Sequence, residues 1–200
     1  MTSTHIRQAT DGEEEDVARL IATSFRDLDV NQWLVPDRER HDDVFPRFFR
    51  IIVGHALRHG TVQVTEDMSA AAVWIPVPSP EIPDYDARLL EACGPWADRF
   101  RRFDDAMHEA HPADRGDHDH LALLAVLPGR QGHGIGTELI RLHHDELDRA
   151  GRPAYLEASN SASRRLYARH GYTDCAEPLD LPYEGERMYP MWRPAGAAAG

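Results

Sequence analysis

The amino-acid sequence predicts a single domain of the α/β (α+β) class. Short apolar segments bounded by turn residues alternate with longer segments whose apolar residues recur at helical spacing. The 200 residues suit one domain, and an apolar content of 42% is enough to build one core. The composition does not shift along the chain, so we expect one folded unit over residues 1–193 and a disordered tail of small residues over 194–200.

The first sixty residues predict one strand and two helices. Residues 5–9 read as the strand, and Asp11 is expected to cap a helix over about 14–25, whose first turn is acidic. A linker over 26–36 follows. The next helix, over about 38–59, contains Pro46, which predicts a kink or a break because proline lacks the amide hydrogen.

A hairpin and a two-part helical segment follow. Strands over 61–65 and 70–76 are joined by four turn residues. Residues 84–108 should be helical in two pieces, because Gly94 and Pro95 interrupt the pattern. Three apolar residues at helical spacing in the second piece predict core packing: Phe100, Phe103 and Met107.

The C-terminal half alternates strands and helices. We expect a helix ended by Gly151 and a second one that Ser159 or Asn160 caps and Gly171 ends. The last two strands should form an antiparallel pair. The predicted strands of this half cover 121–127, 154–158, 172–175 and 186–192, and the first of the two helices covers 135–150.

Composition excludes several classes of function. Asp and Glu number 34 against 22 basic residues, and the net charge of −12 argues against nucleic acid or an anionic membrane as partner. It suits a small cationic substrate. All the basic residues are arginine, which rules out Schiff-base chemistry on lysine. Cys93 and Cys175 are too few for a disulfide framework or a zinc site.

Two further properties bear on location and metals. The chain starts without an apolar segment, and no apolar run approaches the roughly 18 residues of a membrane span, so we expect a cytoplasmic protein. His108, His111, His118 and His120 lie among aspartates, which makes a metal site conceivable. The spacing matches no known metal motif, so we predict no metal.

A glycine-rich turn is the centre of the predicted chemistry. It follows the strand over 121–127 and reads Gln131-Gly132-His133-Gly134-Ile135-Gly136, with Thr137 next and a helix beginning there. Glycines let the backbone approach a phosphate, and the helix N-terminus presents free N–H groups and partial positive charge. The turn therefore predicts an anion site.

Other nucleotide-binding motifs fit this turn less well. A P-loop requires a lysine that the chain lacks. A dinucleotide fingerprint requires G-x-G-x-x-G, but Thr137 stands where the third glycine should be. In favour of that motif, Glu157 lies at the end of the next strand, where a ribose-binding acid is expected. A glycine-rich connection without any ligand is the remaining alternative.

Two motifs in order carry a resemblance to a known family. Gln131-x-x-Gly134-x-Gly136 after an apolar strand is similar to the Q/R-x-x-G-x-G/A signature of GNAT (GCN5-related) N-acetyltransferases. About 25 residues later, a segment resembles the family's N-x-x-A/S-x-x-L-Y-x-x-x-G-F/Y pattern. Its matching residues are Asn160, Ser163, Leu166, Tyr167, Gly171 and Tyr172. The length and the segments around Trp74 and 156–159 further resemble antibiotic-modifying members such as puromycin N-acetyltransferase.

The resemblance implies a fold and a cofactor. The family's fold is a mixed, mostly antiparallel sheet of 6–7 strands flanked by helices, with two strands splayed apart at the cofactor site. Acetyl-CoA would be the co-substrate, bound by a core over about 118–175. The pyrophosphate of acetyl-CoA would bind the turn residues Gln131, Gly132, His133, Gly134, Ile135, Gly136 and Thr137. The pantetheine arm would bind backbone groups at Leu124 and Val126. The same site would be lined by Asn160, Ser163 and Tyr167.

The resemblance also implies direct transfer of the acetyl group to a primary amine. Tyr167, with an ordinary pKa of about 10, would donate a proton to the departing thiolate, although a packed tyrosine is the alternative. Glu157 is the first candidate for the base, or else a structural ion-pair partner. His118 and His120 rank next as bases or acceptor contacts.

The acceptor is expected to be a small, cationic, antibiotic-like amine. In the resembling family the segment over 26–36 folds over the acceptor, so we expect Asp29 and Trp33 to contact it; plain packing is the other interpretation of Trp33. The expected partners are this small molecule, no nucleic acid and no membrane, with the chain a monomer or homodimer. Two alternatives stay open: a non-catalytic acyl-CoA-binding regulatory module, and an acetyltransferase acting on a protein or peptide amine.

Overall fold

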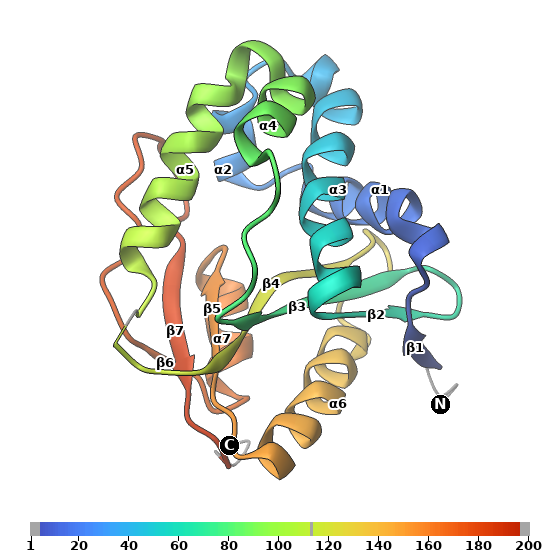
Figure 1. The fold of residues 1–200 in the computed structure, drawn as a ribbon, viewed down its shortest axis with the longest axis vertical. Helices are drawn as coiled ribbons and strands as arrows, with labels where there is room; N and C mark the ends of the chain where they lie inside the picture. The colour runs from blue at the N-terminus through green and yellow to red at the C-terminus, as the bar shows by residue number, and fades with distance from the viewer. Residues whose placement is uncertain (1–4, 113, 197–200) are drawn as a thin grey trace.

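A single seven-stranded sheet organises the chain (Figure 1). The computed structural model describes residues 5–112 and 114–196. The strand order is β1-β2-β3-β4-β5-β7-β6, and all neighbours are antiparallel except β4 and β5, which are parallel. The strands are β1 (Ile6–Gln8), β2 (Thr61–Thr65), β3 (Ala70–Val77), β4 (His118–Val126), β5 (Ala154–Ala158), β6 (Thr173–Asp174) and β7 (Tyr189–Arg193). The predicted mixed, mostly antiparallel sheet is confirmed.

Helices cover both faces of this sheet and form two apolar clusters (Figure 1). On one face lie α1 (Glu14–Phe25), α2 (Asp29–Leu34), α3 (His41–His59), α4 (Tyr85–Cys93) and α5 (Ala97–Ala110). On the other face lie α6 (Ile135–Ala150) and α7 (Ser161–Ala168). No helix in the described part of the chain is long and apolar enough to cross a membrane.

Local signals set most of the boundaries. Helix α1 covers the predicted residues, and α6 ends at Gly151, which takes the left-handed φ of 65° that favours glycine. Asn160 caps α7 by accepting a hydrogen bond from the Ser163 amide at 2.8 Å. Short 3-10 turns precede α1, α3 and α5, over Asp11–Glu13, Arg38–Arg40 and Gly94–Trp96.

The N-terminal half departs from the prediction at three places. Thr10 and Glu13, not Asp11, form the reciprocal cap before α1. The supposed linker contains helix α2, whose six residues are too few to show a periodic pattern. Helix α3 continues through Pro46 without a break, since Phe45, Phe48 and Phe49 around it are held in the core.

The C-terminal end of the described chain is held on α6. Arg193 closes β7, is buried, and pairs with Asp148 on α6 at 2.6 Å. The amide of Gly196 also donates to Asp148, at 2.8 Å. The last residues of the expected tail, 197–200, lie outside the described residues.

An extra residue in β4 changes which way the strand faces. The pairing with β3 runs Trp74 to Leu121 and then Val73 to Leu123, so Ala122 is a β-bulge. Before the bulge, Leu121 packs on the α6 side of the sheet. After it, the next odd-numbered residue, Leu123, packs on the α1 and α3 side, while Leu124 takes the α6 side.

The neighbouring strand β5 diverges from β4 just beyond this point. Their parallel ladder contains two pairs, Asp119 with Ala154 and His120 with Tyr155. The Leu127 amide donates to the Ser69 carbonyl, on the side of β4 where β3 lies. Backbone groups point to alternate edges along a strand, so those of Leu124 and Val126 point to the opposite edge, which β5 leaves open. The bulge and the divergence therefore create the splayed strand pair that the sequence predicted.

Candidate active site

The glycine turn leads directly from the open edge of β4 into α6. Gly132 and Gly134 have φ values of 78° and 83°, in the left-handed region that only glycine adopts without strain. The Gln131 side-chain amide donates to the Val126 carbonyl at 3.0 Å and so fastens the turn to the strand. These contacts explain the Q-x-x-G-x-G spacing.

Free backbone N–H groups converge at this turn. The first helical hydrogen bond of α6 is donated by Glu138 to Gly134, at 3.0 Å. The amides of Ile135, Gly136 and Thr137 therefore have no acceptor inside the helix. With the partial positive charge of a sixteen-residue helix behind them, they fit a phosphate group.

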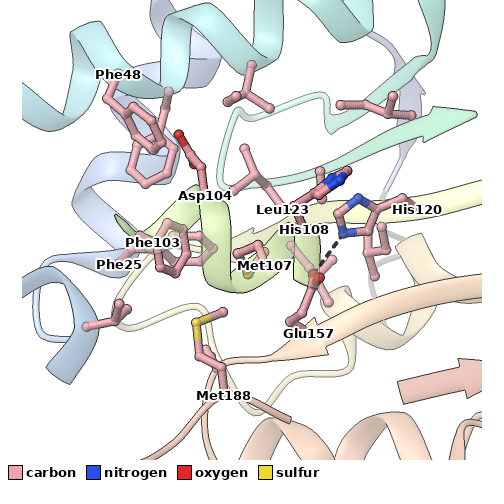
Figure 2. Close-up of a pocket in the computed structure, with 18 of the residues that line it drawn as sticks. Phe25, Phe48, Phe103, Asp104, Met107, His108, His120, Leu123, Glu157 and Met188 are labelled. Carbon is pink, nitrogen blue, oxygen red and sulfur yellow. Dashed lines mark hydrogen bonds and ion pairs between the residues drawn. The ribbon is translucent and has the colours of Figure 1, made fainter. Parts of the chain in front are cut away.

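A cavity of about 660 Å³ lies on the other side of β4 (Figure 2). Its walls come from α1, α2, α3, α4, α5, β3, β4, β5 and α7, and most of them are apolar. The carboxylates that line it are Glu81, Asp104 and Glu157, and the described lining contains no arginine. Such a wall attracts cations and repels anions.

One end of the cavity carries a histidine–carboxylate pair. His120 Nε2 on β4 and Glu157 Oε2 on β5 are 2.8 Å apart, the contact drawn as a dashed line in Figure 2. The Glu157 side chain is only 2% exposed, whereas that of His120 is 19% exposed. Since an ionised carboxylate only accepts hydrogen bonds, His120 Nε2 donates, and Nδ1 keeps its lone pair for another proton.

Two more aromatic residues pack behind this pair. His111 at the end of α5 lines the cavity and its ring centroid lies 5.8 Å from that of His120. Burial, followed by the charge of His120, lowers the pKa of His111 to about 4, so His111 is neutral near pH 7. Burial and then Glu157 raise the pKa of the Tyr155 phenol, which stays protonated.

His118 lies on the same side of β4 as His120 but outside the cavity lining. Its Nδ1 bonds the Gly116 carbonyl at 2.7 Å, and its Nε2 lies 3.2 Å from that of His111. Both ring nitrogens of His118 are thus occupied by the protein. Among the described residues, no group of three or more histidine, cysteine or acidic side chains is arranged to hold a metal ion.

Tyr167 on α7 reaches the cavity from the side of the splayed strands. Its ring is 7% exposed and packs edge-on against Tyr172, with centroids 5.8 Å apart. Burial raises the pKa of the Tyr167 phenol above its ordinary value. The hydroxyl is therefore a proton donor at neutral pH.

The other motif residues of α7 have a structural task. Asn160 and Ser163 bond reciprocally: the Asn160 side chain accepts from the Ser163 amide at 2.8 Å, and the Ser163 hydroxyl contacts the Asn160 amide at 3.1 Å. This capping box stabilises the start of α7 and so positions Tyr167 one turn further on. Any contact of these two residues with a cofactor stays a prediction.

Asp29 and Trp33 do not reach the cavity. Asp29 accepts a hydrogen bond from the Glu186 amide at 2.8 Å, and Trp33 packs between Tyr183 and Arg99. Their helix does contribute Val30, Asn31 and Leu34 to the lining. Whether the 26–36 segment folds over an acceptor stays a prediction.

Several lining residues were not expected from the sequence. Phe103 and Met107 pack against the core as expected, and they also line the cavity, which the sequence did not indicate. Asp104 and Tyr85 were not singled out at all. Asp104 could have been noticed in the sequence because Phe103 and Met107, at i−1 and i+3, place its carboxylate beside an apolar helix face.

A protein-family model matches one region of the chain. The model of the acetyltransferase (GNAT) domain matches residues 102–174. These include β4, the glycine turn, the splayed strands and α7. Over these residues the match agrees with the family resemblance inferred from the two motifs.

Solved structures similar to this chain span its whole length. The Corynebacterium glutamicum protein described as histone acetyltransferase HPA2 and related acetyltransferase has a TM-score of 0.73 and 19% identity, covering 100% of both chains. Arylalkylamine N-acetyltransferase 2 from Aedes aegypti has a TM-score of 0.71 and 14% identity, covering 98% of this chain and 100% of its own.

The polyamine N-acetyltransferase of Drosophila melanogaster is also similar, with a TM-score of 0.64 and 16% identity over 95% of this chain and 98% of its own. At such identities the likeness establishes the GNAT fold over nearly the entire chain, including the helices α1 to α4 that precede the matched domain.

Proposed function

We propose that this protein is an acetyl-CoA-dependent N-acetyltransferase that transfers the acetyl group directly to the primary amine of a small cationic molecule. The single observation that carries the proposal is the junction at β4. On one side of this strand lie the open backbone edge and the glycine turn. On the other side lies a cavity lined by carboxylates, and one end of it is formed by His120 and Glu157.

The residues at the open edge fit acetyl-CoA. The pantetheine arm carries amides, for which the free backbone groups of Leu124 and the Val126 amide are suitable partners. The amides of residues 135–137 fit the pyrophosphate. When bound, the cofactor supplies an activated acetyl thioester, and the chain itself need not form an acyl-enzyme.

His120 and Glu157 are suited to act together as the base. A primary ammonium must lose a proton before its nitrogen can attack, and His120 Nδ1 is the atom of the pair that remains free to take it. Buried Glu157 fixes the imidazole tautomer and stabilises the positive ring that results. Glu157 thus acts through His120 rather than alone.

Tyr167 is suited to act as the acid. As the amine nitrogen bonds the acetyl carbon, the carbon–sulfur bond breaks and the sulfur receives the electron pair. A thiolate in a largely apolar site gains from a nearby proton donor, and the Tyr167 phenol is kept protonated by burial. Once the nitrogen is bonded to the acetyl carbon it loses a second proton, which restores the Tyr167 hydroxyl. The proton taken at His120 returns to solvent before the next cycle.

The acceptor class follows from the walls of the cavity. A lining of aliphatic and aromatic side chains with carboxylates and without arginine favours an apolar amine that is positively charged in solution. The similarity to arylalkylamine and polyamine N-acetyltransferases supports an amine acceptor. Two further parts of this proposal are a cytoplasmic location and an antibiotic-like amine as the acceptor.

The proposal is tested by screening primary amines with acetyl-CoA while the release of free thiol is followed. We expect release that depends on the amine and is strongest for apolar primary amines. A regulatory module would bind acetyl-CoA and release no thiol with any amine. A peptide acetyltransferase would act faster on peptide N-termini than on every small amine, and either outcome would contradict the proposal.

A further inference from the structure

A second carboxylate lies in the apolar part of the cavity, apart from His120 and Glu157. Asp104 projects from α5 into a lining that includes Phe48, Phe103 and Met107. In Figure 2 its carboxylate and the His120–Glu157 pair lie on opposite sides of the view. The reaction as proposed above makes no use of this group.

The protein stabilises this carboxylate only in part. Tyr85 donates its phenolic hydrogen to Asp104 Oδ2 at 2.7 Å. The other oxygen, Oδ1, accepts no hydrogen bond from the described residues and is not among the polar atoms cut off from solvent. No arginine or histidine forms an ion pair with Asp104 in the described part of the chain. The neighbouring charges that act on its pKa, Asp105 and then Asp86, are acidic and raise it.

Such an arrangement is costly for the free protein. A carboxylate taken out of water needs an opposite charge to offset its lost hydration. Here burial raises the pKa of Asp104 to about 6, so the group is mainly ionised at pH 8 but without a cation. A cation brought by a ligand would restore the missing interaction.

The helix gives the spacing between the two polar ends. Asp104 and His111 both line the cavity. His111 directly follows the last residue of α5, and a helical step of seven residues advances about 10 Å along the axis. His111 packs against His120, with ring centroids 5.8 Å apart. An acceptor that reaches both ends therefore needs about 10 Å between its charges, with an apolar connection along Met107 and Leu123.

We propose that Asp104, held by Tyr85, is a second cation subsite, and that the preferred acceptors are long-chain diamines. One nitrogen lies at His120 and is acetylated, while the other stays protonated at Asp104. An extended chain advances about 1.2 Å per bond, so about seven or eight carbons separate the two nitrogens. This inference rests on the proposed acetyl transfer and names its acceptor class.

The test compares acceptors that differ only in the distal group. Initial rates with acetyl-CoA at pH 8 are measured for 1,8-diaminooctane, n-octylamine, 8-amino-1-octanol and 8-aminooctanoic acid, and for diamines with four to ten carbons. A charge-assisted contact predicts a kcat/KM for diaminooctane roughly tenfold to a hundredfold above that for octylamine. Short diamines and the amino acid should be poor acceptors.

The variant Asp104→Asn separates charge from shape. The amide can still accept the Tyr85 hydrogen bond, so the fold is retained, which the melting temperature checks. The ratio of kcat/KM for diaminooctane to that for octylamine should fall to about one. Asp105→Asn removes an equal charge from the exposed neighbour on α5 and should leave the ratio unchanged.

Binding without catalysis provides a separate readout. Diaminooctane should raise the melting temperature of the wild-type protein clearly more than that of Asp104→Asn, because only the former offers the carboxylate. Equal preference for diamine and monoamine in the wild type, or an unchanged ratio in Asp104→Asn, would overturn the subsite while leaving acetyl transfer intact. If no amine is acetylated, the proposed function fails, and equal thermal shifts would then refute the subsite as well.

Discussion

At the scale of single residues, the proposed chemistry depends on three side chains from three elements. His120 comes from β4, Glu157 from β5 and Tyr167 from α7, and all three line one cavity. The motif predicted Tyr167, because its spacing from the cap of α7 is fixed by the helix. The pairing of His120 with Glu157 could not be predicted, since 37 residues separate them and only the sheet brings them together.

Removing the Tyr167 hydroxyl should impair turnover more than binding. Tyr167→Phe keeps the ring that packs on Tyr172, so acetyl-CoA affinity should hold while kcat falls by roughly a hundredfold. Tyr189→Phe, in which a hydroxyl is lost from β7 outside the cavity lining, serves as the matched control. Steady-state kinetics measure both, and an unchanged kcat would assign Tyr167 a packing role alone.

Neutralising Glu157 should change the pH dependence of the reaction. In Glu157→Gln the protonated His120 ring loses its partner carboxylate, so the acidic limb of kcat/KM should move to lower pH. The plateau should drop by roughly tenfold to a hundredfold because the tautomer is no longer fixed. Glu91→Gln, an exposed change on α4, should keep the wild-type profile. A profile of unaltered shape in Glu157→Gln would remove the pair from the mechanism.

At the scale of elements, β4 determines where the site lies. Its bulge at Ala122 turns the backbone of Leu124 and Val126 to the edge that β5 leaves open. The sequence predicted the strand, the turn and α6 because apolar periodicity and glycines mark them locally. The bulge has no such mark, as it arises from the pairing of two apolar strands.

A negative charge in the glycine turn should weaken acetyl-CoA binding. A Cβ built on Gly134 meets nothing within 4 Å, so a side chain there has room, although its φ of 83° is strained for any residue but glycine. Gly134→Asn and Gly134→Asp share shape and strain and differ in charge. Calorimetry should show a loss of more than tenfold for Asp and a clearly smaller loss for Asn. Equal affinities of the two variants would exclude phosphate binding at this turn.

The helices near the cavity were predicted with less success than the sheet. The apolar face of α5 packs against the core as expected, but part of it also lines the cavity, and periodicity cannot reveal that second role. For the same reason Asp104 looks like an ordinary helix-surface acid in the sequence. Asp29 and Trp33 are on α2 but do not line the cavity, whereas Val30, Asn31 and Leu34 of the same helix do.

At the scale of the whole molecule, several buried histidines are held in their neutral form. Burial is the first cause that lowers their pKa values, and it lowers that of His144 to about 3. His144 lies on the buried face of α6, and its Nε2 is 3.0 Å from the Tyr172 hydroxyl. The histidines concerned are His55, His111, His118, His144 and His170.

The lowered pKa values of these histidines predict that the protein loses stability in mild acid. A histidine whose folded-state pKa is depressed binds its proton more readily in the unfolded chain. The contribution of such a histidine to the free energy of unfolding is complete above its unfolded-state pKa of about 6.5. It is lost as pH falls towards the folded-state pKa, at up to about 1.4 kcal/mol per pH unit for each group. Asp104, whose pKa is raised, opposes the trend weakly.

Urea unfolding between pH 7 and pH 5 measures this effect. The free energy of unfolding should fall with pH in the wild-type protein and less steeply in His144→Gln, whose amide cannot take up a proton. His5→Gln, at an exposed position that pairs with Glu66 on the surface, should keep the wild-type slope. A slope in His144→Gln as steep as that of the wild type would contradict the proposed role of burial.

The most direct test of the central claim is the fate of the acetyl group. The protein is mixed with isotopically labelled acetyl-CoA and an apolar primary amine, and both the amine and the intact chain are examined by mass spectrometry. We expect the label on the amine nitrogen, free CoA in equal amount, and none on the protein at any time. Label retained on the chain, or released as acetate with the amine unmodified, would contradict direct transfer.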